Sequence, residues 1–97
     1  MSFVQIIEAR TKHMDELKAL DEQWEKATEG RRTLRRSIIA RDRKEPDHFM
    51  ILAFFDSYES AMENSNLPET SAFAAKQVAL FDGSPTFYDL DIIDDRS

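Results

Sequence analysis

The chain has no cysteine and only two glycines among its 97 residues. Without cysteine there is no disulfide, no thiolate nucleophile and no zinc site built on thiolates. There is also no glycine-rich phosphate loop and no Ser/His/Asp grouping. These absences exclude the sequence signatures of nucleotide-binding proteins and of the common hydrolases.

Long hydrophobic runs are also absent. No apolar stretch approaches the ~18 residues that a membrane span needs. The N-terminal residues alternate in polarity and lack the basic, apolar and small-residue regions of a signal peptide. We therefore expect a cytoplasmic protein with no membrane partner.

The composition is that of one globular domain. Hydrophobic residues make up 41% of the chain and charged residues 33%, a balance typical of folded soluble proteins. A chain of this length supports one hydrophobic core but not two. We treat residues 1–97 as a single domain.

Basic residues are scarce in the second half of the chain. Residues 1–44 carry 11 basic and 8 acidic side chains, whereas residues 45–97 carry 2 and 11, and the net charge is −6. Seven basic side chains fall between Arg31 and Lys44. An acidic protein repels phosphates, so we expect no nucleic-acid partner and interpret the basic run as solvated strand faces with internal ion pairs.

The first half of the chain shows a strand, a helix and a second strand. Residues 2–9 alternate in polarity, as a mostly buried strand does. The next segment has one apolar helical face, with Thr11 as the expected N-cap and Gly30 as the stop. That face consists of Met14, Leu17, Leu20, Trp24 and Ala27. Residues 33–43 alternate less regularly and predict a second strand.

The second half repeats this pattern. A turn at residues 44–47 leads into an almost continuous apolar run over 48–55, typical of a central strand. Asp56 is the expected cap of a helix, with Glu59 completing a capping box. The helix breaks at 64–66 and restarts at Pro68, a residue suited to the first helical position.

The chain closes with the end of that helix and a last strand. The restarted helix buries Phe73, Ala74, Phe81 and either Gln77 or Val78, and is expected to end at Gly83. Residues 85–93 alternate as a strand. The tail that follows is expected to fray.

The order β-α-β-β-α-β predicts an α+β, ferredoxin-like fold. Right-handed crossovers place the strands in one antiparallel sheet, order 4-1-3-2, with both helices on one face. The first and third strands are apolar on both faces, so a monomer would expose a large apolar patch. We therefore predict a homodimer that packs sheet to sheet.

Three stretches resemble one known family. They are residues 54–70 (FFDSYESAMENSNLPET), 82–87 (DGSPTF) and 89–91 (DLD). They are similar to the dimeric α/β-barrel superfamily, and within it to small proteins grouped with antibiotic biosynthesis monooxygenases. The resemblance covers essentially the whole chain, but its motifs are structural more than catalytic.

The resemblance implies two ferredoxin-like protomers forming a barrel, with a pocket between sheet and helices in each. Characterised members oxidise aromatic quinols with dioxygen and no metal or flavin, and others degrade haem. The haem-degrading members use an Asn, a Trp and a His. The nearest strand positions here are Gln5 and Phe54 or Phe55, and residues 68–81 contain no histidine. That departure argues against haem, and we expect no cofactor.

No residue stands out as catalytic, and His48 and Arg36 are the only candidates. A general base needs a cleft and a suitable pKa, whereas His48 follows a turn and solvent exposure is the simpler expectation. His13 is less suited, and two isolated histidines predict no metal site. Arg36 lies between Leu34 and Ile38, so it faces inward or toward a partner. It either anchors an anionic ligand or pairs with a carboxylate, and we favour pairing.

Four aromatic residues are candidates for a ligand-binding pocket wall: Trp24, Tyr58, Phe81 and Tyr88. Core packing explains each of them without a ligand and is the interpretation we favour. Asn64 and Asn66, at the helix break, could cap a helix or line a pocket mouth, and capping is the more economical explanation.

The two sheet edges carry opposite charge. Arginines 35, 36, 41 and 43 lie on the second strand, and aspartates 89, 91, 94 and 95 on the fourth strand and tail. These edges are far apart in one protomer but can meet in a dimer. We predict cross-protomer Arg–Asp pairs, which set register more than they add stability.

Three functions fit these features. The first is a cofactor-independent monooxygenase acting on a small aromatic ligand, which rests mainly on the resemblance. The second is a non-catalytic small-molecule-binding or dimerisation module of the same fold. The third, an RNA-binding domain, is disfavoured because the acidic chain lacks the Gly-Phe-rich strand whose aromatics stack bases.

Overall fold

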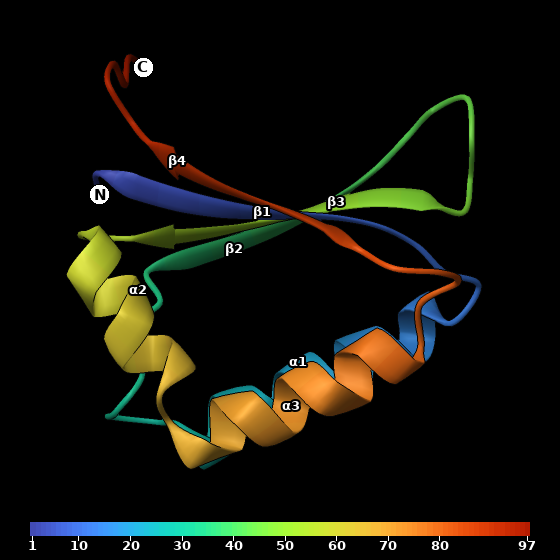
Figure 1. The fold of residues 1–97 in the computed structure, drawn as a ribbon, viewed down its shortest axis with the longest axis horizontal. Coiled ribbons are helices and arrows are strands. Elements are labelled where there is room, and N and C mark those ends of the chain that lie inside the picture. The colour runs from blue at the N-terminus through green and yellow to red at the C-terminus, as the bar shows by residue number, and fades with distance from the viewer.

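The computed structural model describes residues 1–97 and confirms the predicted α+β, ferredoxin-like fold (Figure 1). Its elements are β1 (Phe3–Arg10), α1 (Met14–Ala27), β2 (Arg36–Arg41), β3 (His48–Phe55), α2 (Tyr58–Ser65), α3 (Pro68–Ala79) and β4 (Thr86–Asp91). The strands form one antiparallel sheet in the order β2-β3-β1-β4. This is the predicted order 4-1-3-2, numbered from the opposite edge. The helices lie on one side of the sheet.

The sheet has a helix face and an open face, because successive side chains of a strand point to opposite sides. On β1, Phe3 packs with Ala61 of α2, and Ala9 packs with Leu17 of α1. Odd-numbered β1 residues therefore face the helices. Even-numbered β1 residues lie on the open face, which no helix covers (Figure 1). On this face Val4 is buried, with 8% of its surface exposed, and Ile6 is half-buried.

The core consists of two separate clusters. One contains Ala9, Leu17, Ile51 and Phe81, and the other contains Phe3, Phe55 and Ala61. Only 14 of the 97 residues are buried. The core is this sparse because one sheet face is uncovered and because the two clusters do not meet under the helices.

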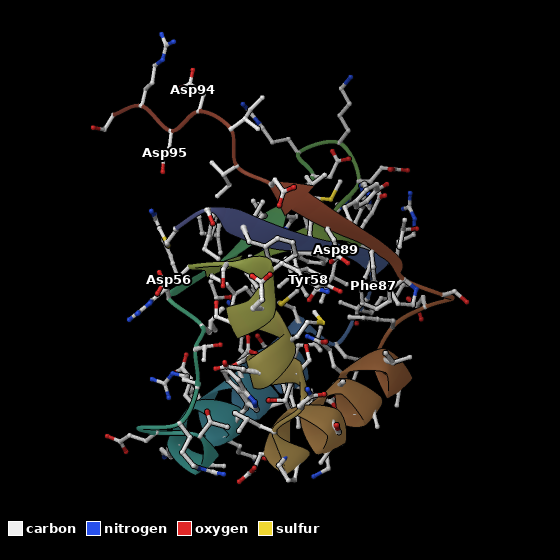
Figure 2. The ribbon with its side chains drawn as sticks, turned by 60° about the vertical axis from the view of Figure 1, so that its left-hand side comes forward. Asp56, Tyr58, Phe87, Asp89, Asp94 and Asp95 are labelled. Carbon is white, nitrogen blue, oxygen red and sulfur yellow. The ribbon has the colours of Figure 1, made fainter.

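The predicted cap of α2 was wrong by one residue. The N-cap is Ser57, whose side chain accepts a hydrogen bond from the Ser60 backbone N–H, while the Ser60 hydroxyl accepts one from Ser57 N–H. This reciprocal pair is a capping box. Asp56 lies just before the helix (Figure 2). It binds Arg35 instead, with 2.6 Å between Oδ2 and a guanidinium nitrogen.

The predicted cap of α1 was also wrong. The cap position is occupied by His13, whose side chain makes no capping hydrogen bond. Thr11 is buried. Its hydroxyl accepts a hydrogen bond from His13 N–H at 2.9 Å and donates one to the Leu80 carbonyl at 2.7 Å. Thr11 therefore ties the entry of α1 to the end of α3.

Several other boundaries shifted. The helix break at residues 64–66 and the restart at Pro68 are confirmed. However, α3 ends at Ala79, and Gly83 follows in a turn with a φ of +83°. The edge strands β2 and β4 are shorter than the predicted 33–43 and 85–93. None of the helices has the length and hydropathy that crossing a membrane requires.

Candidate functional site

A cavity of about 310 Å³ lies between the sheet and the helices. It separates the two core clusters, since Ile51 of one and Phe55 of the other both line it. Every strand and every helix contributes to its wall. Its volume is at the low end of the ~300–1,000 Å³ typical of ligand pockets, so it suits a small molecule of one or two rings.

The cavity wall is apolar with polar groups set into it. Ten of its 18 residues are hydrophobic, and four of these are aromatic: Trp24, Phe55, Phe73 and Phe87. Seven more carry neutral amide or hydroxyl groups, and the last is Asp21. A largely apolar wall with a few polar groups is the usual composition of a small-molecule site.

Trp24 is held firmly in the wall. Its Nε1–H donates to the Thr70 hydroxyl at 2.9 Å, which links α1 to α3. Its ring centroid lies 6.0 Å from that of Phe73, a separation typical of favourable aromatic pairs. The buried Thr28 hydroxyl donates to the Trp24 carbonyl at 2.7 Å and completes the last turn of α1. This indole therefore presents a fixed surface to the cavity.

Asp21 is the only ionisable side chain on the wall. It is half-buried on α1, and it forms no ion pair and no side-chain hydrogen bond in the protein. Burial raises the pKa of the Asp21 carboxyl to about 6, and the nearby charge of Glu25 adds to that rise. At neutral pH it is an ionised group without a partner, and it is easily protonated.

Three amide side chains contribute to the polar part of the wall. Gln77 is buried with 8% of its surface exposed, and Asn64 with 6%. Asn64 accepts a hydrogen bond from the Thr33 backbone N–H at 3.1 Å, so it joins α2 to the segment before β2. Gln5 donates to Asp89 on β4 at 3.2 Å. These contacts fix the amides of Asn64 and Gln5, and all three amides lie on the cavity wall.

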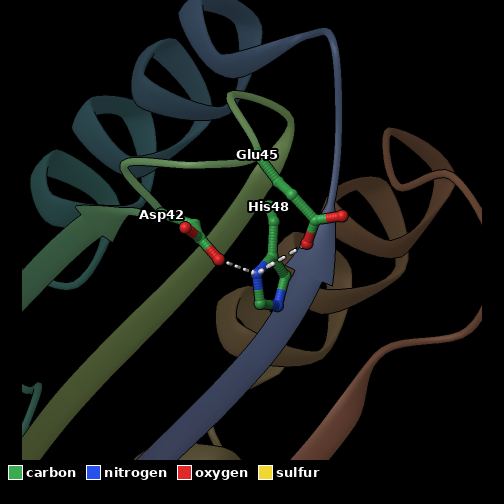
Figure 3. A group of neighbouring side chains, drawn as sticks. All are labelled: Asp42, Glu45 and His48. Carbon is green, nitrogen blue, oxygen red and sulfur yellow. Dashed lines mark hydrogen bonds and ion pairs between the residues drawn. The ribbon is translucent and has the colours of Figure 1, made fainter.

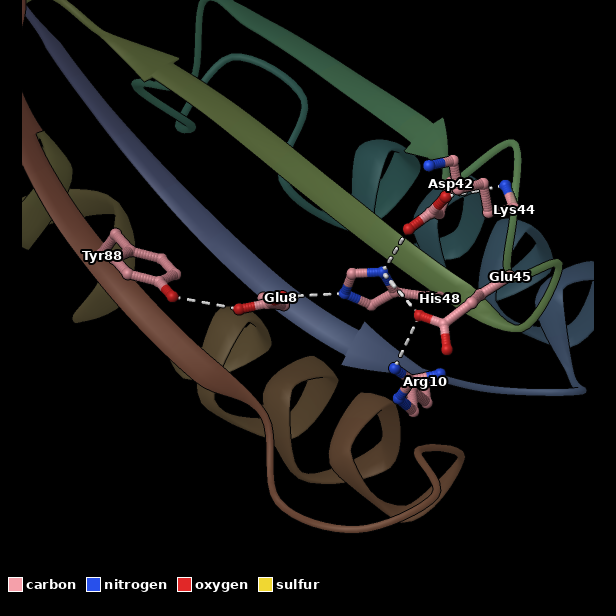
Figure 4. A network of polar contacts seen from close by, with 7 residues as sticks. All are labelled: Glu8, Arg10, Asp42, Lys44, Glu45, His48 and Tyr88. Atoms are coloured by element: carbon pink, nitrogen blue, oxygen red, sulfur yellow. Dashed lines mark hydrogen bonds and ion pairs between the residues drawn. The ribbon is translucent and has the colours of Figure 1, made fainter.

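A second polar group lies on the open face of the sheet (Figure 4). Each strand, or the residue following it, supplies one member, and the four form a continuous line. The Tyr88 hydroxyl donates to Glu8 at 3.0 Å, and the other Glu8 oxygen is 2.7 Å from His48 Nε2. His48 Nδ1 is 3.0 Å from Asp42. A carboxylate at both ring nitrogens favours the protonated imidazolium.

This network shifts the pKa values of its members in opposite directions. Hydrogen bonds from Asp42 and then Glu8 raise the pKa of His48. The bond from His48 lowers the pKa of Asp42, and His48 and then Tyr88 lower that of Glu8. The contribution of His48 to stability is therefore complete below its unfolded value of 6.5 and is lost as pH rises through its folded pKa. The contribution of Asp42 and Glu8 to stability is present above their unfolded pKa values and is lost as pH falls through their lowered folded pKa values.

We expect His48→Gln to lower the melting temperature most near pH 5 to 6 and least near pH 9. At pH 5 to 6 the imidazolium and both carboxylates are charged, and the imidazolium is lost as pH rises through its raised pKa. Thermal unfolding from pH 4 to 9 measures this. His13→Gln is the matched control, since His13 is half-exposed and contacts only Glu16, at 3.4 Å. Equal losses for both variants, or a loss independent of pH, would contradict the ion-pair interpretation.

The same group includes a cluster with metal-ligand chemistry. Atoms of Asp42, Glu45 and His48 lie within 4.8 Å of one another (Figure 3). However, the Arg10 guanidinium is 2.9 Å from the Glu45 carboxylate, and His48 Nδ1 already faces Asp42. Two cationic side chains therefore balance the carboxylates, and we interpret the cluster as part of the ion-pair network.

The two predicted catalytic candidates lie outside the cavity wall. The expectation that His48 is solvent-exposed was wrong, since only 15% of its side chain is exposed within the network. Arg36 is exposed and forms no ion pair within the protomer. Because it shares strand parity with Ile38, it lies on the open face at the β2 edge. The predicted pairing of Arg36 with a carboxylate is not made within the protomer, and its pairing across a dimer stays a prediction.

Of the four predicted wall aromatics, Trp24 lies on the cavity wall and the other three lie elsewhere. Tyr58 is 49% exposed and packs edge-on against Phe3. Phe81 is part of the core cluster at the far end of α3. Tyr88 is on the open face in the ion-pair network. Phe87, its neighbour, points to the helix side and lines the cavity.

Sequence reasoning missed Asp21 and did not single out Gln77 as a site residue. Both could have been found from helical spacing. Asp21 is four residues after Leu17 and three before Trp24, the two buried residues of α1. Gln77 is four residues after Phe73. A polar residue on the apolar face of a helix that covers a cavity is a candidate site residue.

The fold places the chain in a class of small α+β proteins with one antiparallel sheet and a cavity beneath the helices. No family model and no curated protein matches the sequence. Among solved structures, the chain is similar to a conserved protein of Methanosarcina mazei Go1, with a TM-score of 0.76 and 9% identity over 95% of this chain and 94% of that one.

Other similar structures carry an activity in their names. A candidate antibiotic biosynthesis monooxygenase of Chloroflexus aurantiacus J-10-fl has a TM-score of 0.73 and 20% identity, covering 100% of this chain and 98% of that one. Another, from Deinococcus radiodurans, has a TM-score of 0.74 and 13% identity, with coverage of 98% and 96%. At these identities the likeness shows the fold alone. The chain has the fold of proteins named antibiotic biosynthesis monooxygenases, as its sequence resemblance predicts.

Proposed function

We propose that the protein binds a small aromatic ligand in the cavity between sheet and helices and oxidises it with dioxygen without a cofactor. The observation that carries the proposal is the cavity itself, with four aromatic side chains on a wall that is otherwise apolar or neutral. The names of several proteins of the same fold support the reaction class. The sequence resemblance pointed to the same chemistry.

Without a cofactor, the substrate must supply all the electrons that reduce dioxygen. For a hydroquinone, one oxygen atom enters the ring as a hydroxyl group and the other leaves as water. The ring is oxidised to a hydroxyquinone, so four electrons pass from one substrate to one dioxygen. The protein would contribute a dry cavity, a fixed ring orientation and a proton acceptor.

A binding protein without catalysis is the second candidate. Asp21 is the only ionisable side chain on the wall, so the protein offers one group at most to move a proton. Many reactions use an acid and a base together. A cavity with one ionisable group is therefore also what a binding module would have.

Ligand binding is expected to change the fluorescence of Trp24, because this only tryptophan lies on the cavity wall. Titration with catechol and hydroquinone measures binding, and an oxygen electrode measures turnover. Saturable binding with uptake of one dioxygen per hydroquinone supports the oxygenase. Binding without uptake supports the binding module.

Ala53→Phe is expected to abolish that binding, because Ala53 lies on the cavity wall and a phenyl ring there fills the space. Ala75→Phe adds the same ring on an exposed position of α3 outside the wall and should leave binding intact. If no aromatic probe binds the wild-type protein, or if both variants bind equally well, the cavity is not the site.

We also propose that the protein is a homodimer joined through the open face. An apolar patch lies there in cross-strand register, in which Val4 is buried and the other residues are half-buried or exposed. It comprises Val4, Ile6, Ile38, Met50, Leu52, Phe54 and Leu90. A patch of this kind usually marks an interface, and a second copy offers the same surface by symmetry.

Within the protomer, several residues of the predicted edge pairs already have partners. Arg35 binds Asp56 of its own protomer, and Asp94 binds Arg96. Asp89 accepts a hydrogen bond from Gln5. Arg36 remains the best placed to reach a partner, because it lies exposed on the open face of an edge strand.

A further inference from the structure

We propose that the ligand of the cavity carries a positive charge beside its aromatic ring, as an arylalkylammonium does, and that this charge pairs with Asp21. The inference rests on the proposed binding function and names the class of molecule that this site would take. It depends on the placement of a single carboxylate in an otherwise uncharged wall.

The carboxylate of Asp21 has no cation available to it within the cavity. Of the 18 wall residues it alone is ionisable, and the residues that α3 and the sheet contribute are neutral. On its own helix, Glu25 is a like charge. The Arg32 guanidinium lies over the Trp24 ring, 6.0 Å from its centroid, but it donates to the Glu25 carbonyl and is not part of the wall.

An ionised carboxylate that is half-buried without a partner costs free energy. That cost is the reason its pKa is raised to about 6. A cationic ligand would offset the cost by supplying the missing charge, a neutral ligand would leave it, and an anionic ligand would increase it. The net charge of −6 favours the approach of cations in the same way.

The aromatic wall next to Asp21 suits the same ligand. Trp24 lies three residues further along α1, on the same helical face, and Phe73 packs against it. Aromatic faces attract cations as well as rings, and tryptophan does so most strongly. The wall amides of Gln5 and Gln77 offer carbonyl oxygens to the remaining N–H donors of an ammonium group. The wall therefore offers a carboxylate, an indole ring and two amide oxygens to the same ammonium ligand.

Three probes of similar shape test the proposal: 2-phenylethylamine, 2-phenylethanol and 3-phenylpropionate. Their affinities are measured at pH 7 through Trp24 fluorescence and calorimetry. We expect the amine to bind at least tenfold more tightly than the alcohol, and the acid to bind most weakly. A charge-assisted hydrogen bond in a partly desolvated site is worth about that much, at roughly 1.4 kcal/mol per tenfold.

Asp21→Asn should reduce the amine affinity about tenfold and leave the alcohol affinity within about twofold, since only the charged contact is lost. Glu22→Gln is the matched control. It removes an equal charge from the next residue of α1, which is exposed and not on the cavity wall. Circular dichroism of each variant establishes that it is folded.

The wild-type protein gives a test that needs no substitution. Between pH 7 and pH 5 the amine affinity should fall about fivefold, as Asp21 with its pKa of about 6 takes up a proton, while the alcohol affinity stays constant. If the alcohol binds as tightly as the amine, or if Asp21→Asn leaves the amine affinity unchanged, the inference is overturned and the proposed aromatic site stands. If none of the probes binds, the proposed function itself fails.

Discussion

Asp21→Asn is expected to stabilise the protein at neutral pH by about 1–2 kcal/mol, although it removes a residue of the candidate site. The pKa of Asp21 rises from 3.8 to about 6 on folding because burial disfavours its charged form. A shift of that size corresponds to at most about 3 kcal/mol at roughly 1.4 kcal/mol per unit. Water reaches the half-buried carboxyl, which reduces the figure. Asparagine keeps the shape of the side chain and carries no charge to desolvate.

The pH dependence of this gain follows from the direction of the shift. The folded protein holds the proton more tightly than the unfolded chain, so the cost of Asp21 is absent below about pH 4 and complete above about pH 6. The advantage of the variant should therefore shrink as pH falls from 7.5 to 4. Urea unfolding at pH 7.5, 5.5 and 4 measures it, with Glu22→Gln as the exposed control. A variant no more stable than wild type at pH 7.5 would show that the carboxylate is already compensated.

A residue that lowers stability and faces a cavity indicates a ligand site more strongly than a residue that only packs in the core. Folded proteins tend to keep such groups where function needs them. The Glu8–His48–Asp42 network is the opposite case, because each charge there has a partner within the protomer. The contrast supports placing the ligand site under the helices rather than at the histidine.

The fold could be predicted because its signals are local. The alternating runs, the apolar stripe of α1 and Pro68 each specify an element, and crossover handedness leaves few topologies. Element ends were harder to place, because two adjacent polar residues, such as Asp56 and Ser57, can compete for one cap. The backbone angles that decide between them are not encoded by residue type alone.

The site could be predicted only in part. Trp24 was expected on a wall and lies there. Tyr88 and Phe87 are adjacent aromatic residues of one strand, so only the register with β1 decides which one lines the cavity. Asp21 stands among the acidic residues of α1 and looks like part of a solvated face. Asp21 differs from the other acidic residues of α1 because it lines the cavity. That cavity depends on the separation of the two core clusters in the fold.

Leu52→Lys is expected to convert a dimeric protein to monomers. Leu52 lies at the centre of the open face, paired with Ile6 on one side and Ile38 on the other. In a dimer with facing sheets, the substitution buries an unpaired ammonium group in each protomer, and an uncompensated buried charge costs roughly 3–5 kcal/mol. In the monomer the same lysine would simply extend into water. Light scattering after size exclusion, at several concentrations, gives the mass of both proteins.

Ile93→Lys is the matched control, because Ile93 follows the last strand and is 95% exposed. It makes the same change of charge and should leave the mass unchanged. A second comparison concerns the edges: reversing Asp89 and Asp91 to lysine should weaken the dimer more at low than at moderate salt if arginines of the partner pair with them. A wild-type protein that is monomeric at every concentration would rule out the open face as a self-association surface. A folded Leu52→Lys variant with the wild-type dimer mass would instead show that the dimer forms elsewhere, because no sheet-to-sheet interface accommodates two unpaired charges at its centre.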